Sequence, residues 1–424
     1  MKELCAMSRD ELSALYEQTL AEYKRCQSLG LKLDMSRGKP SKAQLDLSAE
    51  LANMVIPPEA FISDGIEARN YGKLDGLDAC KKLFADILGV RPGQIFCGGN
   101  SSLTLMYDTI TKAYTHGMLH SDLPWSKLDK VKFLCPSPGY DRHFAICQTY
   151  GMEMIPVPMT DEGPDMNVVM SYIADPAVKG MWCVPKYSNP TGITYSDETI
   201  HSIASMKPAA KDFLLMWDNA YCIHEFEGDF VPFIDILSEC ERYGNADMVF
   251  EFTSTSKVTF PGAGVACFAC SEDNMTYMKK LISAQSISYD KVNQLRHVLL
   301  LKDREGALAH MRKHARIMSE KVNAVIELLD EHIKPLGIAE YKKPTGGYFI
   351  SLNVMPGCAK KVFTLMKEAG VVMTTAGATF PYGNDPQDSN LRIAPSYPPI
   401  DELRMATQVL CTCVKLAALE KLAN

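Results

Sequence analysis

The sequence predicts an α/β protein with two domains, a large one built on a mainly parallel sheet of the seven-stranded type and a smaller α+β one. Short apolar runs bounded by turn residues alternate with helical segments from about residue 75, which is typical of strands buried on both faces. The length of 424 residues also exceeds one ordinary domain. The expected strands are 131–135, 155–159, 180–184, 213–217, 248–252 and 264–269. Two helices, 77–88 and 103–114, are expected before the first of these strands.

The N-terminal region is expected to form a helix followed by an arm. Ser8 and Glu11 have the spacing of a capping box, which starts a helix that ends near Gly30. A turn-rich, extended stretch then runs from Met35 to Leu47. We assign residues 1–50 to this helix and arm, as part of the smaller domain.

The remaining chain divides at about residue 300. Residues 51–300 are assigned to the large domain and residues 301–424 to the small C-terminal domain. One long helix of mixed charge is expected near 290–330, followed by an antiparallel strand pair within 339–352. An amphipathic helix is expected from Asp401 to the end.

Composition and charge exclude several classes of protein. A net charge of -7 argues against nucleic-acid binding, which usually needs a basic patch. No apolar run approaches the length of a membrane span, and the polar start is unlike a signal peptide. Cys267 and Cys270 form the one C-x-x-C, inside an apolar run, so we expect buried strand cysteines rather than a zinc site. Free thiols indicate a reducing compartment, and we expect a cytoplasmic protein.

Two pairs of histidines have helical spacing. His116 and His120 lack the carboxylate of an H-E-x-x-H pattern, so we expect them at the surface. His310 and His314 alternate with arginines and are expected on a solvated basic helix face. The sequence therefore predicts no metal site.

Chemically useful side chains follow three of the predicted strands, where ligands of open α/β sheets bind. Asp218 and Tyr221 come after 213–217: a carboxylate can pair with a protonated ring nitrogen, and a tyrosine can reach a phenolate oxygen of that ring. By themselves they could equally be a helix N-cap and a core tyrosine. Asn189, after 180–184, lies in S-N-P-T-G, which alone reads as a tight turn.

The third strand is followed by a hydroxyl-rich turn that ends in a lysine. Ser254 and Ser256 precede Lys257, a combination that suits an anion beside an amine nucleophile. A lysine in an apolar stretch is costly unless its pKa shifts or it reacts.

The order N-P-T-G, D-x-x-Y and S-x-S-K resembles that of the fold-type I pyridoxal-phosphate enzymes, the class I/II aminotransferases, over about residues 30–420. The stretches SRGKP, CPSPGYDRHF, STSKVTFPGAGVA and LRIAPSYP are most similar to the aspartate-aminotransferase-like subgroup. The resemblance implies fold type I and pyridoxal 5'-phosphate as cofactor. It also implies ping-pong transfer of an α-amino group between an L-amino acid, plausibly aspartate or glutamate, and a 2-oxo acid.

The resemblance assigns roles around the cofactor ring. Lys257 matches the lysine that holds the cofactor as a Schiff base and then shuttles a proton. Asp218 matches the carboxylate that keeps the pyridine nitrogen protonated. Asn189 and Tyr221 match the hydrogen-bonding partners of the ring oxygen O3′. Tyr140 falls where an aromatic side chain stacks on the ring, and the matching family histidine is His143, which would orient Asp218.

The resemblance also implies sites for the phosphate and the substrate. Tyr71 matches the tyrosine that reaches the phosphate of a neighbouring subunit, which implies a homodimer with a shared active site. Arg392 matches the arginine that binds the substrate α-carboxylate, beside Gly38 and Asn189. The remaining expected phosphate ligands are Asn100, Ser101 and Ser102 at a helix start, with Ser254 and Ser256.

The sequence departs from the family pattern at two points. Many members carry an arginine seven or eight residues after the lysine, where this chain has Gly264 and Val265. The residue that binds a substrate side-chain carboxylate is also open, with Arg37 and Arg296 as candidates.

Two alternatives stay beside the aminotransferase. The same lysine and aspartate would serve a pyridoxal-phosphate lyase that eliminates or decarboxylates. An effector-sensing domain of a transcription regulator would need a DNA-binding module before it. Only about 30 residues precede the region of resemblance, and the chain is acidic, so we do not expect such a module.

Overall fold

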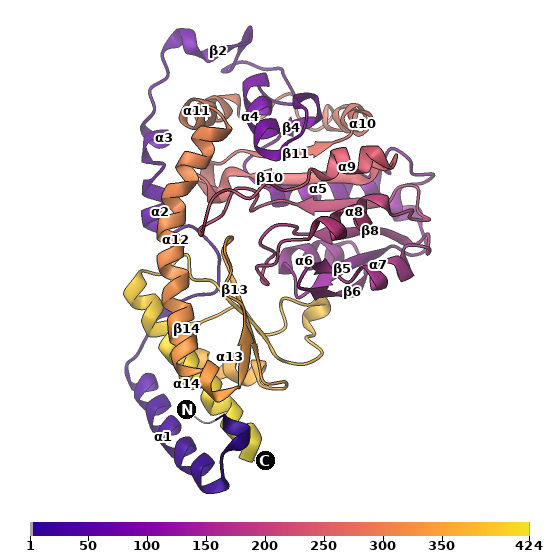
Figure 1. Cartoon of the computed structure of the whole chain (residues 1–424). Helices are drawn as coiled ribbons and strands as arrows, with labels where there is room; N and C mark the ends of the chain where they lie inside the picture. The colour runs from indigo at the N-terminus through magenta and orange to yellow at the C-terminus, as the bar shows by residue number, and fades with distance from the viewer. Residues whose placement is uncertain (1–2, 424) are drawn as a thin grey trace.

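The computed structural model describes residues 3–423, and its centre is a mixed but mainly parallel sheet (Figure 1). The strand order is β4-β11-β10-β9-β8-β5-β6-β7. Strand β11 runs antiparallel to both neighbours and β7 antiparallel to β6, while the others are parallel. The bounds are β4 Ile95–Cys97, β5 Lys132–Ser137, β6 Glu153–Thr160, β7 Gly163–Pro164, β8 Val178–Cys183, β9 Leu214–Asp218, β10 Val249–Ser254 and β11 Ala266–Cys270.

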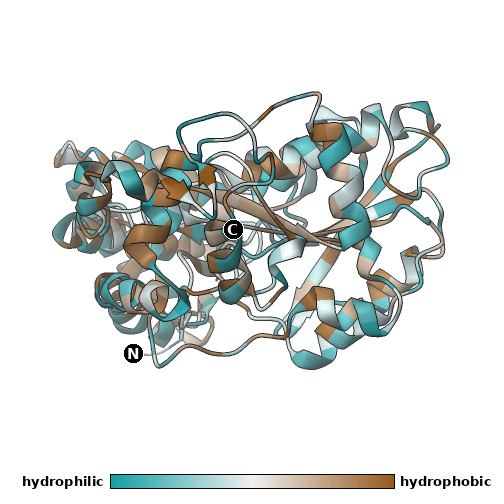
Figure 2. Cartoon of the chain, turned by 90° about the horizontal axis from the view of Figure 1, so that it is seen from above, coloured by the Kyte–Doolittle hydropathy of each residue, from teal (hydrophilic) through white to brown (hydrophobic). Residues whose placement is uncertain are grey.

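Helices cover both faces of this sheet because its strands are apolar on both sides. Phe250 and Phe252 of β10 face one hydrophobic cluster, and Val249 faces the other. Figure 2 shows hydrophobic colouring on the central strands and mixed colouring on the helices around them. One face carries α5 (Ser102–Thr115), α6 (Asp141–Thr149) and α10 (Glu272–Ile282); the other carries α4 (Asp78–Leu88), α7 (Met166–Tyr172), α8 (Asp197–Ser205), α9 (Ile236–Arg242) and α11 (Lys291–Leu301).

A second, smaller body surrounds a three-stranded antiparallel sheet of order β12-β13-β15. Both ends of the described chain meet here: α1 packs beside α14, and β1 pairs in parallel with β14 (Figure 1). The strands are β1 Leu33–Asp34, β12 Ala339–Tyr341, β13 Ile350–Val354, β14 Val371–Val372 and β15 Asn390–Ile393. The helices are α1 Arg9–Ser28, α12 Arg304–His332, α13 Ala359–Glu368 and α14 Ile400–Ala423.

The segment between α1 and α4 is a long connection with little regular structure. It holds the short helices α2 (Lys42–Asp46) and α3 (Ala49–Asn53) and the two-residue strands β2 (Ile62–Ser63) and β3 (Ile66–Glu67). Helix α2 packs against α12, and α3 packs against α11. The N-terminal arm is therefore laid along helices from the later part of the chain.

The predicted elements are largely present, with differences at the helices. The capping box of Ser8 and Glu11 is confirmed at the start of α1. The prediction of one long helix near 290–330 is wrong: α11 ends before Lys302, whose φ of 64° cannot continue a helix, and α12 begins at Arg304. The tail helix α14 is present, but its middle is buried on most sides because it packs against α1, α12 and α13.

Candidate active site

A cavity of about 640 Å³ opens beyond the carboxyl ends of β5, β8, β9 and β10, and the small body closes its other side. This is where a parallel α/β sheet binds its ligands. All but three of the predicted site residues line it. The predicted residues that line the cavity are Gly38, Ser101, Ser102, Tyr140, Asn189, Asp218, Tyr221, Ser254, Ser256, Lys257 and Arg392.

Lys257 ends a short 3-10 turn, Thr255–Lys257, that directly follows β10. Its Nζ lies 5.0 Å from the ring centroid of Tyr221 and 5.8 Å from that of Tyr348. Burial lowers the pKa of the Lys257 amine, and the charge of Asp218 opposes this shift only in part. A lysine with a lowered pKa is more often neutral, and the neutral amine is the nucleophile.

Asp218 is the last residue of β9 and is buried, with 4% of its surface exposed. Its Oδ2 lies 3.0 Å from Nε2 of His143, whose ring stacks on Trp182. Its Oδ1 is also buried and has no hydrogen-bond partner within residues 3–423. Because a buried carboxylate oxygen without a donor is costly, this atom fits a cationic N–H group brought by a ligand.

Two tyrosines flank this carboxylate. Tyr140 precedes α6 and Tyr221 follows β9, and both line the cavity. Burial raises the pKa of Tyr140 to about 12 and raises that of Tyr221 well above its usual range. Both hydroxyls therefore stay protonated near neutral pH and can donate hydrogen bonds to a ligand oxygen.

Arg392 lies in the middle of β15 and points into the cavity, away from its buried neighbours Leu391 and Ile393. Its Nη1 donates to Asp141 Oδ1 at 2.9 Å and to Asn189 Oδ1 at 3.2 Å. Its Nε donates to Thr374 Oγ1 at 3.2 Å, and its guanidinium carbon lies 5.0 Å from the centroid of the Phe349 ring. The guanidinium is thus held in place while part of its donor edge faces the cavity.

The backbone at Gly38 lies against the ring of Phe349. A Cβ at this position would lie 2.4 Å from the Phe349 ring, nearer than real side chains approach. The glycine is therefore required by packing on the ring that lies under Arg392.

Sequence reasoning missed three of the residues around Arg392. Asp141 pairs with the guanidinium, Thr374 accepts from it, and Phe349 lies beneath it. Asp141 directly follows Tyr140 in the P-G-Y-D-R-H motif, so the motif itself held a signal. Thr374 and Phe349 had none, because only the tertiary fold brings them to Arg392.

The expected phosphate region lies at the N-terminus of α5. Ser101 is the N-cap residue, yet its hydroxyl does not cap the helix, so the first N–H groups stay open toward the cavity. Ser254 Oγ donates to Ser256 Oγ at 3.0 Å, and Ser256 Oγ donates to Asn100 O at 3.5 Å, so the Ser256 hydroxyl lies beside the start of α5. Asn100 lies outside the cavity lining, and its Nδ2 donates to Pro261 O at 3.4 Å.

The missing arginine has a steric explanation. A Cβ on Gly264 would lie 2.9 Å from Phe260 O and 3.0 Å from Thr255 Oγ1. The turn after Lys257 is therefore too tight for a side chain at this position. Of the two candidates for a second carboxylate, Arg37 lines the cavity and Arg296 does not.

The other predicted residues lie apart from the cavity. Tyr71 is 79% exposed on a loop whose carbonyls Asn70 O and Gly72 O accept from buried Lys291. His116 and His120 are exposed, and Cys267 and Cys270 are buried in β11, as predicted. Within residues 3–423 no group of three or more histidines, cysteines or acids could hold a metal ion, and no helix there is long and apolar enough to cross a membrane.

Known proteins share this architecture. A family model described as aspartate amino-transferase matches residues 7–424. The chain is 44% identical over 415 residues to an aspartate aminotransferase of Corynebacterium glutamicum, which covers 98% of this chain and 96% of the relative. The crystal structure of an aspartate transaminase from the same species has a TM-score of 0.96 at 43% identity, over 99% of each chain. An α-aminoadipate aminotransferase of Thermus thermophilus, solved with N-(5'-phosphopyridoxyl)-L-leucine, shares the fold with a TM-score of 0.73 at 21% identity over 95% of each chain.

Proposed function

We propose that this chain, which belongs to the aspartate aminotransferase family and is a pyridoxal-phosphate-dependent aminotransferase of fold type I, takes acidic L-amino acids as amino donors. The family match favours amino-group transfer over the lyase alternative. The observation that carries the proposal is the shared cavity of Lys257, Asp218 and Arg392. An amine, a buried carboxylate and a guanidinium are the three groups that the reaction needs.

The residues of the cavity fit pyridoxal phosphate. When bound as a Schiff base to Lys257, this cofactor supplies an electron sink for the substrate Cα. The unpartnered Oδ1 of Asp218 would accept from the protonated pyridine nitrogen, and His143 keeps the carboxylate oriented. Asn189 and Tyr221 would donate to the ring oxygen, and Tyr140, which lines the same cavity, would stack on the ring.

The phosphate would lie at the open N-terminus of α5. The N–H groups there, with the hydroxyls of Ser101, Ser102, Ser254 and Ser256, offer donors to an anion. Lys257, freed from the cofactor, would accept and return the proton of the substrate Cα, a role that its lowered pKa supports.

The charge of the cavity supports an acidic substrate. Arg392 would bind the α-carboxylate with the part of its guanidinium that faces the cavity. Arg37, Lys39 and Arg142 also line the cavity and are exposed at its mouth. Together with Arg392 and Lys257, these three make five basic residues that line the cavity, against two carboxylates, Asp141 and Asp218.

A homodimer with a shared active site belongs to the same proposal. The exposed Tyr71, on a loop that Lys291 fixes, would reach the phosphate of a second subunit. A cytoplasmic location agrees with the fourteen cysteines, all within the described residues and all free.

A half-reaction screen tests the proposal. Each L-amino acid is added to the purified holoenzyme without an oxo acid, and the visible absorption band of the cofactor is followed. L-aspartate and L-glutamate should convert the band at concentrations at which L-alanine and L-leucine do not. Conversion by apolar amino acids alone would contradict the acidic substrate, and release of pyruvate and ammonia without an acceptor would favour a lyase.

A further inference from the structure

A buried chain of polar side chains runs from the N-terminal arm to the backbone of Lys257. Gln44 of α2 is fully buried, and Tyr348 and His314 are each only 2% exposed. The prediction that His310 and His314 lie on a solvated helix face is therefore wrong. Helix α2 covers this side of α12, with Gln44 facing His314 and Ser48 facing His310.

The directions of these hydrogen bonds are fixed by Gln44. Its Oε1 accepts from the backbone N–H of Ser41 at 3.0 Å, so its amide nitrogen is the group that points inward. That nitrogen donates to Tyr348 Oη at 2.9 Å and lies 3.4 Å from His314 Nδ1. Tyr348 accepts from Gln44, which leaves its own proton for the carbonyl of Lys257, 3.5 Å away.

A second contact holds the next peptide group. The carbonyl of Val258 accepts from Nε2 of His310 at 2.9 Å. The consecutive carbonyls of Lys257 and Val258 are thus bound by two side chains of the small body. Tyr348 binds the first, and His310 of α12 binds the second. The backbone of Lys257 is fixed from outside the sheet that carries it.

The same chain reaches the substrate arginine. Tyr348 has its ring beside the Lys257 amine, with Nζ 5.8 Å from the centroid. Its neighbour Phe349 lies under Arg392 and against Gly38. Residues 348–349 therefore span from the amine to the guanidinium.

We propose that Gln44 is a positioning residue: by fixing the Tyr348 hydroxyl it holds the Lys257 backbone, and with it the amine, in register with the carboxylate site at Arg392. The proposal rests on the proposed role of Lys257. Gln44 also closes the capping box of α2 through its Oε1, which is a purely structural role. The two roles use different atoms, so they can be separated.

Gln44→Glu separates them. A glutamate keeps the acceptor that caps α2, and at pH 9, above the pKa of about 8 that burial gives Glu251, it is ionised and has no hydrogen to donate. Tyr348 would then turn its proton to the carboxylate and release the Lys257 carbonyl. We expect kcat to fall about tenfold, as for a misplaced acid–base group, with KM within about twofold. In Gln44→Leu, which adds no charge, the pH midpoint of the cofactor's visible band should fall by about half a unit, because the rings of Tyr221 and Tyr348 that favour a cationic lysine nitrogen lose their alignment.

Gln94→Leu is the matched control. Gln94 is also a buried capping-box glutamine, 2% exposed, but its Nε2 donates to Glu241, far from the cavity. We expect Gln94→Leu to lower Tm as Gln44→Leu does, without moving the pH midpoint. A Gln44→Glu variant with wild-type kcat, or a Gln44→Leu variant with the wild-type midpoint, would overturn the proposal.

Tyr348→Phe gives an independent test that does not touch the α2 cap. The proposal requires that Gln44→Leu adds no further loss of kcat on the Tyr348→Phe background, because both act through one hydroxyl. Fully additive losses would overturn it. Failure of the proposed function is distinguishable, because only that failure would leave Lys257→Ala active.

Discussion

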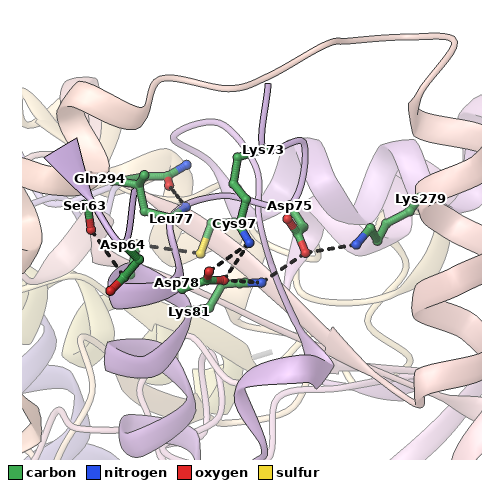
Figure 3. Close-up of polar contacts among 11 residues, drawn as sticks. Ser63, Asp64, Lys73, Asp75, Leu77, Asp78, Lys81, Cys97, Lys279 and Gln294 are labelled. Carbon is green, nitrogen blue, oxygen red and sulfur yellow. Dashed lines mark hydrogen bonds and ion pairs between the residues drawn. The ribbon is translucent and has the colours of Figure 1, made fainter. Parts of the chain in front are cut away.

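Lys81, which is buried, and Lys257, which is half-buried in the cavity, have opposite environments, and the contrast separates a structural charge from a chemical one. Lys81 of α4 donates to Asp75 Oδ2 at 3.0 Å and pairs with Asp78 at 2.8 Å, and Lys279 donates to the same oxygen of Asp75 at 3.0 Å. Figure 3 shows Asp75 between the two ammonium groups. Lys257 forms no ion pair or hydrogen bond through its amine within residues 3–423.

The pKa shifts follow from the partners. Burial would lower the pKa of Lys81, but the two carboxylates raise it above its ordinary value. Burial lowers the pKa of Lys257, and the charge of Asp218 does not reverse the shift. A buried lysine with carboxylate partners is fixed as a cation and stabilises the fold, whereas one without them is left as a reactive amine.

The largest expected effect is at the chemical lysine. Lys257→Ala should lower kcat by at least about 10⁴-fold, the upper range for a positioned acid–base group, and remove the cofactor's visible band. Because Lys257 has no ion pair to lose, the Tm of the apoprotein should stay within about 3 °C of the wild type. Steady-state kinetics, absorption spectra and calorimetry measure these effects. An active, yellow variant would remove Lys257 from the mechanism.

Glu251 tests whether every unsatisfied buried group is a binding group. It is 2% exposed and accepts from Asn219 Nδ2 at 2.8 Å, but does not line the cavity. Burial raises its pKa to about 8. The folded state keeps a proton that the unfolded chain loses near pH 4, so this contribution to stability is complete below about pH 4 and is lost as the pH rises to about 8.

Glu251→Gln should therefore stabilise the protein at pH 9, by up to about 4 kcal/mol, and change little at pH 4. Denaturant unfolding at several pH values measures this difference. Cofactor binding should stay within about twofold at pH 7, because the glutamate is neutral there. Equal stabilisation at both pH values would show that Glu251 does not titrate in this range.

For Lys81 we expect a substitution to lower the stability of the fold without lowering kcat. Lys81→Ala leaves the buried Asp75 with one partner fewer and should cost about 3 kcal/mol of unfolding free energy. Lys82→Ala, one residue along α4, removes an exposed pair with Asp86 and should cost less than about 1 kcal/mol. Both variants should keep wild-type kcat. A tenfold lower kcat in Lys81→Ala alone would contradict a purely structural role for Lys81.

The smallest expected effect is at Arg392, the proposed ligand of the substrate carboxylate. Arg392→Lys keeps the charge but loses the fork of donors, so kcat/KM for amino acids should fall about 30-fold, or about 2 kcal/mol. Arg404→Lys, at an exposed pair with Glu327, is the control and should be unchanged. Half-reaction kinetics measure both, and an unaffected Arg392→Lys would show that a point charge is sufficient.

Local patterns in the sequence were sufficient for six of the eight strands of the large sheet and for most of the cavity. Strands buried on both faces read as apolar runs, and the residues directly after them, such as Asn189 and Asp218, converge because parallel strands end at one edge. The three-residue strand β4 was missed because so short a run carries no pattern. The break at Lys302 was missed because lysine is a good helix former, so its residue type does not predict the positive φ that it adopts.

The sequence by itself predicted which side chains would hold the cofactor and bind an amino acid, since these side chains lie in short motifs that follow one another along the chain. Only the tertiary structure decided what surrounds them. Residue type does not distinguish Lys81 from Lys257. Contacts between distant segments make Lys81 a fixed cation and leave Lys257 as an amine of lowered pKa. His310 and His314 became buried for the same reason, because burial depends on which distant segment covers a helix face.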